Sequence, residues 1–226
     1  MNREPRFYAW IAFHNGYYEV SGEDDRKEFS YAPVWKRGKD KKYKQLVQFM
    51  KTQNMGITND NKYGTKTGYL NKKGAHPGTS ASKSTGFKVI NYPWPMVRLA
   101  ELYLNYAEAC VECNDLPEAK RYLNYVRGRA GIPTVEESWD GIAELTQNKL
   151  REIVRQERLI ELYMENHNFW DIRRWGIAET LGEQPKGLSV QAKTITEFAK
   201  PVSVDVQRRF IPAHYLMPLP ISEINK

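Results

Sequence analysis

The feature that most constrains the fold is a pair of segments without helix breakers, separated by a short polar turn. Residues 96–113 contain no proline or glycine and are rich in Leu, Ala and Glu. Apolar residues recur there at intervals of three and four, the period of a helix that buries one face. We therefore predict a helix over 96–113, with a buried stripe made of Leu99, Tyr103, Tyr106, Ala107 and Cys110.

A second helix is expected from Pro117 to Arg129. Asn114 and Asp115 break the first helix, and Asp115 can cap the next one, which has Pro117 in its first turn. Gly131, followed by Pro133, is a stop signal. The inward side chains are predicted to be Ala119, Tyr122, Leu123 and Val126.

The two helices together resemble one tetratricopeptide unit of about 34 residues. Ala107 and Ala119 fall where such a unit needs small residues for close helix approach. One unit cannot bury its outer faces alone, so its partner is either missing from the chain or supplied by a later helix.

That later helix is predicted over 147–166, with a buried face made of Leu150, Ile153, Val154, Ile160 and Tyr163. A short helical piece, 169–178, follows and carries Trp170 and Trp175, which we expect in the core. Three prolines near the end, between 210 and 221, favour an extended strap laid over the core.

The first part of the chain has a different character. Residues 6–13 are rich in aromatics and are interpreted as a strand, and Asn15-Gly16 indicates a hairpin turn. The segment 21–86 is polar, basic and dotted with glycine, with one helix-like piece near 43–51. The predicted fold class is mainly α: a tetratricopeptide-like hairpin and packed helices, with long irregular loops and a little β structure. We expect one structural unit, with a loop-rich, ligand-facing segment at 1–90 and a helical region at 91–226.

The net charge and the cysteine content do not by themselves exclude a nucleic-acid, metal or redox function. The net charge is +7, and a basic run lies at 36–42. No nucleic-acid motif accompanies this run, so it is interpreted as a solvated loop and no nucleic-acid partner is expected. Cys110 and Cys113 form a lone C-x-x-C without further zinc ligands, which favours packing over metal or redox chemistry. We predict no cofactor and no metal site.

The charged residues of the third helix offer the one candidate for catalysis. Glu157 and Glu161 lie one helical turn apart, as an acid and a base in glycoside hydrolysis could. However, flanking arginines lower a carboxylate pKa and make a poor general acid. We interpret the charges as ion pairs that hold the third helix to the first, in a structural network of Arg98, Glu101, Glu157, Arg158, Glu161, Asp171 and Arg174.

Seven segments, in order, resemble motifs of the SusD/RagB family of nutrient-binding outer-membrane lipoproteins. Glu4-Pro5-Arg6 is similar to its DPR segment, and Thr67-Gly68-Tyr69 to its TGYY segment. The remaining segments, similar to P..R.AE..L.YAEA, LN.VR.RAG, ER..EL, fwDLRRW and YLlPIP..EI, are 95–109, 123–131, 157–162, 170–175 and 215–224. Asn166 and Asn168 stand where the family usually carries Gly and Arg, so a charge contact common in the family is expected to be absent or rerouted.

The resemblance implies the C-terminal portion of a SusD-like fold, truncated at the N-terminus. It also implies non-catalytic capture of a glycan or other nutrient at the cell outer membrane, for import by a SusC-like TonB-dependent transporter. The implied ligand is an oligosaccharide or peptide, and the implied membrane link is a lipid anchor absent from this chain. A helical-repeat interaction scaffold and a glycan-degrading enzyme are the alternatives.

In the resembled family, loops between the DPR and TGYY segments form part of the ligand platform. The matching span here holds four aromatic residues, Tyr17, Tyr18, Tyr31 and Trp35. Because sugar rings stack their C–H faces on aromatic side chains, these four are the candidate ligand-binding residues. The alternative is that they anchor the loop to the helical core.

Overall fold

The chain divides into two compact units in a computed structural model. The model describes residues 3–21, 34–35, 42–51, 53, 64–76, 79–82, 86–91, 93–139, 145–179, 184–204, 209–216 and 221–224. Unit 1 comprises 1–94 and 184–206, and unit 2 comprises 95–183 and 207–226.

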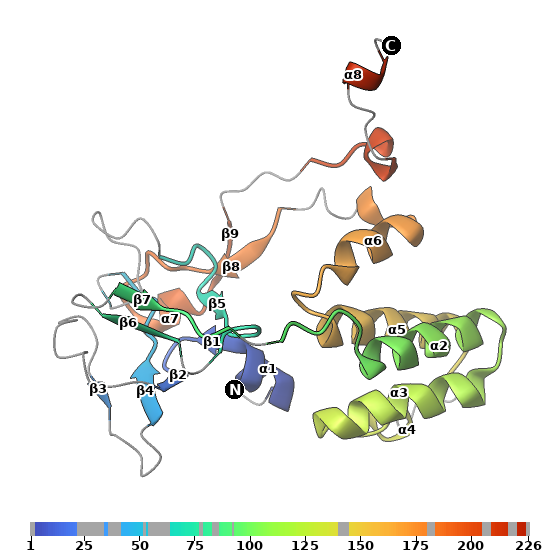
Figure 1. Cartoon of the computed structure of the whole chain (residues 1–226), viewed down its shortest axis with the longest axis horizontal. Helices are drawn as coiled ribbons and strands as arrows, with labels where there is room; N and C mark the ends of the chain where they lie inside the picture. Colours follow the sequence, from blue (N-terminus) through green and yellow to red (C-terminus); the bar gives the residue numbers. More distant parts are fainter. Residues whose placement is uncertain are drawn as a thin grey trace. The chain divides into compact units, whose positions relative to one another are not determined.

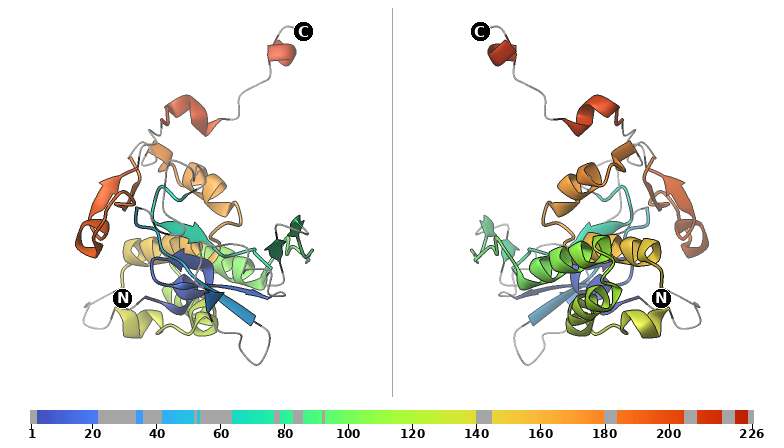
Figure 2. Two further views of the ribbon diagram at one scale, coloured as in Figure 1. Left: turned by 90° about the vertical axis from the view of Figure 1, so that its left-hand side faces the viewer. Right: turned by 90° about the vertical axis from the view of Figure 1, so that its right-hand side faces the viewer.

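Unit 2 is built on the predicted helical hairpin. Its two helices are α2 (Leu99–Glu112) and α3 (Leu116–Ala130), and α2 also packs against α5 (Gln147–Glu161) (Figure 1 and Figure 2). The later helix thus supplies a neighbour for the hairpin. The smaller helical elements of unit 2 are α4 (Val135–Ser138), α6 (His167–Arg174), the 3-10 helix η3 (Pro212–Tyr215) and α8 (Ile221–Ile224).

Local sequence explains where these helices begin and end. Asn114 adopts a left-handed conformation (φ 60°) after α2, and the Asp115 carboxylate accepts from the Glu118 amide at the start of α3. Gly131, at φ 69°, ends α3. The side chain of Thr146 caps α5 by accepting from the amide of Lys149.

The core of unit 2 confirms the predicted buried stripe of α2 in part, since Ala107 and Cys110 are buried and Tyr103 packs against the core. Leu99 and Tyr106 are exposed, whereas Ala100, Leu104 and Val111 are buried. The buried set still follows helical spacing, so the sequence pattern allowed two overlapping stripes and packing against α3 and α5 selected one. The two small residues predicted to allow close helix approach, Ala107 and Ala119, are both fully buried. The other core residues of unit 2 include Leu123, Val126, Val135, Leu150, Ile153 and Val154.

The third helix ends earlier than predicted, at Glu161 rather than Asn166. Met164 and Asn166 have positive φ angles (61° and 65°), which a helix cannot contain. The left-handed conformation of Asn166 also explains why glycine suits this position, since Asn is among the few other residues that tolerate it.

Two further predictions for unit 2 were wrong. Trp170 is 56% exposed, not buried, while Trp175 is half-buried. Residues 212–215 form a 3-10 helix instead of an extended strap, because Pro212 occupies its first position, where a missing N–H costs nothing.

Unit 1 is assembled from short strands that pair over long sequence distances. After α1 (Pro5–Trp10), β1 (Ile11–Phe13) pairs with β5 (Tyr69–Asn71), and β2 (Tyr17–Ser21) and β3 (Val34–Trp35) flank β4 (Lys42–Leu46). The other pairs are β6 (Ser80–Ser82) with β7 (Gly86–Lys88), and β8 (Lys186–Leu188) with β9 (Pro201–Ser203). A short helix, α7 (Ile195–Phe198), precedes β9. Three local predictions fail here: most of 6–13 is helix, Asn15-Gly16 does not join a hairpin, and the helix-like piece near 43–51 begins as strand β4.

The turn before β5 packs closely on β8. The amide of Leu188 donates to the carbonyl of Thr67 (2.9 Å), and Gly68 has a φ of 76°. A Cβ at Gly187 would lie 2.7 Å from the Cα of Thr67, so only glycine permits this approach. The Thr-Gly-Tyr segment is therefore a packing element that joins two parts of unit 1. The core below it contains Ala12, Val47, Phe49, Val190, Ala192 and Phe198.

Candidate ligand-binding surface and the polar network of unit 2

Three of the four candidate aromatic residues lie on one small sheet. Tyr17 and Tyr18 are on β2, Trp35 is on β3, and both strands pair with β4. Trp35 and Glu19 share the partner Lys44, while Tyr18 and Val34 share the partner Gln45. Since directly opposed residues share a face and successive residues alternate, this register places Tyr17 and Trp35 on one face of the sheet and Tyr18 on the other.

The two faces have different roles. Tyr18 is half-buried and packs against the core of unit 1, and its burial raises the pKa of its hydroxyl. This is the anchoring role that was the alternative to ligand contact. Tyr31 lies outside the described residues. We define the face that carries Tyr17 and Trp35 as the β2–β4–β3 face.

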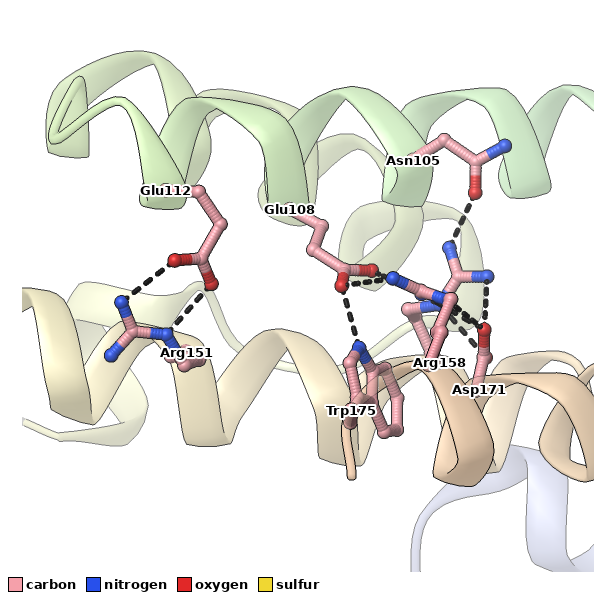
Figure 3. A network of polar contacts seen from close by, with 8 residues as sticks. Asn105, Glu108, Glu112, Arg151, Arg158, Asp171 and Trp175 are labelled. Atoms are coloured by element: carbon pink, nitrogen blue, oxygen red, sulfur yellow. Dashed lines mark hydrogen bonds and ion pairs between the residues drawn. The ribbon is translucent and has the colours of Figure 1, made fainter. Parts of the chain in front are cut away.

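A second candidate, the charged network, lies wholly within unit 2 and joins α2, α5 and α6 (Figure 3). Arg158 donates to both carboxylate oxygens of Asp171 (3.0 and 3.2 Å) and to the side-chain oxygen of Asn105 (2.5 Å). Arg174 also donates to Asp171 (2.9 Å) and holds both oxygens of Glu108 (2.5 and 2.6 Å). One arginine from α5 and one from α6 thus clamp carboxylates between them.

Glu161 is the most buried charged group of this network. Its side chain is fully buried and accepts from Arg98 (3.0 Å) and from Arg129 (2.6 Å to each oxygen). Arg98 also makes a two-bond pair with Glu165 (2.9 and 2.8 Å). Glu161 therefore connects the end of α5 to the start of α2 and the end of α3.

The remaining predicted members of the network are placed differently. Glu157 pairs with Arg127 of α3 (3.0 Å), so it links α5 to the second helix of the hairpin. Glu101 Oε2 lies 3.7 Å from Nε2 of His167, beside a histidine instead of an arginine.

Sequence reasoning missed several charged residues of this network, among them Glu108, Arg127, Arg129 and Glu165. Arg127 and Arg129 are in the segment that resembles LN.VR.RAG, so the signal was present but was interpreted as packing alone. A buried Glu needs a cationic partner, which would have prompted a search for arginines outside α5, although helix spacing alone does not say which arginine it is.

These carboxylates are poorly suited to acid–base chemistry. Although burial opposes ionisation of Glu108, hydrogen bonds from Arg174 and from the indole N–H of Trp175 (2.6 Å) hold its pKa below the usual value. A general acid requires the opposite shift, toward the operating pH. Glu157 and Glu161 each have an arginine partner as well.

Neither cysteines nor other side chains form a metal site in the described part of the chain. Cys110 is buried and Cys113 is exposed, and both are free thiols, so the packing prediction holds for Cys110 only. Burial raises the pKa of the Cys110 thiol. No group of three His, Cys, Asp or Glu side chains is arranged to hold a metal ion among the residues described. Within those same residues, no helix is both long and apolar enough to cross a bilayer.

The fold and the network define a helical module with a tetratricopeptide-like hairpin, held by buried arginine–carboxylate pairs. The SusD family model matches residues 1–226, and the chain belongs to the SusD family.

Individual relatives agree with this assignment. A curated SusD-like protein, P25 of Formosa agariphila, is 33% identical over 128 residues, which are 57% of this chain and 21% of that protein. The solved structure of BT4246 superposes with a TM-score of 0.79 at 31% identity, covering 99% of this chain and 35% of that one. A SusD-like protein from Bacteroides fragilis, BF3747, gives a TM-score of 0.66 at 30% identity, covering 99% and 37%. This chain therefore spans about a third of the length of these solved relatives.

Proposed function

We propose that the protein captures a glycan or another nutrient at the outer-membrane surface, without catalysing a reaction, for import by a SusC-like TonB-dependent transporter. The match to the SusD family over the whole chain is the observation that carries this proposal. In this arrangement a lipid anchor holds the protein to the membrane. The proposed membrane link is this anchor and not a helix of the described part of the chain.

The β2–β4–β3 face is the ligand-binding surface that we propose. It lies on the part of unit 1 whose sequence corresponds to the ligand platform of the resembled family. Tyr17 on β2 and Trp35 on β3 are the candidate aromatic residues of this face, and aromatic rings can stack on the C–H face of a sugar. Tyr18 is assigned to packing on the basis of its burial.

The non-catalytic part of the proposal rests on the state of the carboxylates. Glu108, Glu157 and Glu161 are each bound by arginine, and hydrogen bonds from Arg174 and Trp175 lower the pKa of Glu108. Their role is to join helices, so we expect no glycoside hydrolysis by this chain.

A calorimetric titration tests the ligand-binding surface. The chain is titrated with a panel of neutral and acidic oligosaccharides and with peptides. For the ligand that binds, Trp35→Ala should weaken the affinity about tenfold or more, since stacking on one aromatic ring contributes about 1–3 kcal/mol in comparable sites.

Trp94→Ala is the matched control, because Trp94 is 57% exposed and also belongs to unit 1. Equal loss of ligand affinity in both variants would contradict a role for the β2–β4–β3 face.

Cleavage of any oligosaccharide in the panel would contradict the non-catalytic assignment. Failure to co-purify with the transporter expressed beside it would contradict the proposed partner.

A further inference from the structure

A cavity in unit 2 has a composition that the proposed function does not use. It lies between α6 and the segment around η3, with a volume of about 480 Å³, which is within the usual range for small-ligand sites. Its lining includes two arginines, two phenylalanines, an asparagine and a histidine: Arg173, Arg209, Phe169, Phe210, Asn168 and His214.

Arg173 is fixed at the centre of this lining. Its guanidinium carbon lies 3.6 Å from the ring centroid of Phe169 and 5.6 Å from that of Phe210. It donates to the backbone carbonyl of Phe169 (2.7 Å) and to that of His214 (3.3 Å), so it spans both sides of the cavity. Neutral carbonyls thus hold it in place and leave its positive charge uncompensated.

The absence of a carboxylate partner distinguishes these two arginines from most described arginines of unit 2; Arg155 shares it and lies over the ring of Trp175. Arg98, Arg129 and Arg158 all pair with carboxylates. In the described part of the chain, no carboxylate lies within ion-pair distance of Arg173 or Arg209. Two positive charges beside one cavity attract an anion, and the planar guanidinium matches a carboxylate or a sulfate.

The two phenylalanine rings add a second requirement. An apolar wall favours a ligand with an apolar face, and the C–H face of a pyranose provides one. The side-chain amide of Asn168 can bond a hydroxyl of the same ring. A small inorganic anion would meet the arginines but would not extend over the phenylalanine rings.

We propose that this cavity binds an acidic sugar unit, whose carboxylate or sulfate lies against Arg173 and Arg209 and whose ring packs on Phe169 and Phe210. This inference rests on the proposed function and specifies the chemistry of the ligand, at a site separate in sequence from the β2–β4–β3 face.

The test uses isothermal titration of the whole chain with three probes: a galacturonic acid trisaccharide, a sulfated galactose trisaccharide and the neutral galactose trisaccharide. Arg209→Gln is the informative variant, since Arg209 is exposed and its loss removes no contact that holds the fold. We expect an acidic probe to bind more tightly than the neutral one, and Arg209→Gln to weaken the acidic probe about tenfold, since the variant removes a charge-assisted hydrogen bond. The two acidic probes show whether carboxylate or sulfate is preferred.

Arg121→Gln is the control, because it removes the same charge from an exposed arginine that pairs with Glu118 on α3. Phe210→Ala should weaken the acidic trisaccharide but leave its dependence on salt unchanged. If Arg209→Gln and Arg121→Gln weaken the affinity for the acidic probe equally, the effect comes from net charge alone and the proposal is overturned. Equal binding of all three probes would overturn it as well.

The same titrations separate this inference from the proposed function. Neutral glycan binding that depends on Trp35, with no preference for acidic probes, overturns the inference and leaves the function intact. Acidic binding that depends on Arg209 but not on Trp35 supports the cavity and removes the β2–β4–β3 face as its site.

Discussion

At the scale of single residues, the charged groups of unit 2 act as structural links. Glu161 has a side chain with no exposure and accepts from two arginines on different segments, Arg98 and Arg129. A buried charge is stable only when its partners are in place, so removing one member of such a set costs more than the pair contributes by itself.

Replacing Glu161 should therefore destabilise unit 2 strongly. Glu161→Gln keeps the size of the side chain but leaves Arg98 and Arg129 without their shared anion. Because both arginines retain some contact with solvent, we expect a loss of about 2–3 kcal/mol in the free energy of unfolding, measured by urea denaturation followed by circular dichroism.

Glu152→Gln provides the comparison on the same helix. Glu152 is exposed (side chain 71%) and pairs with the exposed Lys149, so its loss should cost less than about 0.5 kcal/mol. A similar cost for the two variants would contradict a structural role for Glu161.

At the scale of elements, two glycines differ in whether the surrounding structure leaves room for a side chain. Gly187, in β8, approaches the backbone of Thr67, whereas nothing lies within 4 Å of a Cβ built on Gly128 in α3. Overpacking against backbone atoms cannot be relieved by a change of rotamer. An exposed helical glycine, by contrast, only adds entropy to the unfolded chain.

The two alanine variants should consequently shift stability in opposite directions. Gly187→Ala should destabilise by about 1–3 kcal/mol, and Gly128→Ala should stabilise by about 0.5–1 kcal/mol. Thermal unfolding measures both. A neutral Gly187→Ala variant would show that β8 does not need its close contact with the Thr67 turn.

The elements also show what sequence can predict. The hairpin and the third helix follow from local spacing and caps, such as Asp115 and Gly131, because a helix satisfies its hydrogen bonds within one segment. Strand β4 was interpreted as helical, since its partners β2 and β3 lie elsewhere in the chain and leave no local signal. For the same reason the sequence identified Tyr17 and Trp35 as candidates but not their shared face, which depends on pairing through β4.

The sequence predicted that the charged residues of the network form ion pairs, but it did not predict which helices the pairs connect. Arg158, Asp171 and Arg174 were expected to form ion pairs, and they lie together on α5 and α6. The partner of Glu157 on α3 could not be deduced, because helix spacing fixes which side chains share a face and not which neighbouring helix that face meets.

At the scale of the whole molecule, the chain forms two units, and unit 1 is completed by a segment that follows most of unit 2 in sequence. The Glu161 network and the Gly187 contact belong to different units, and the contacts described above for the two sites have no residue in common. Perturbations that have no shared partner are expected to act independently.

Hydrogen exchange measured by mass spectrometry tests this independence. Gly187→Ala should reduce amide protection in β8 and β9 and leave α2 and α5 unchanged, while Glu161→Gln should do the reverse. Loss of protection in both units from either variant would contradict two separately stabilised units.

The shared position of Glu161 also has a consequence during synthesis on the ribosome. Arg129 precedes Glu161 by 32 residues, which take about 2 to 6 s to add at ordinary elongation rates. Throughout that interval α2 and α3 can pair, but the two arginines that Glu161 neutralises must stay in water. The face of the hairpin that α5 will cover therefore stays exposed to water. Burial of the two arginines is disfavoured until Glu161 has been translated.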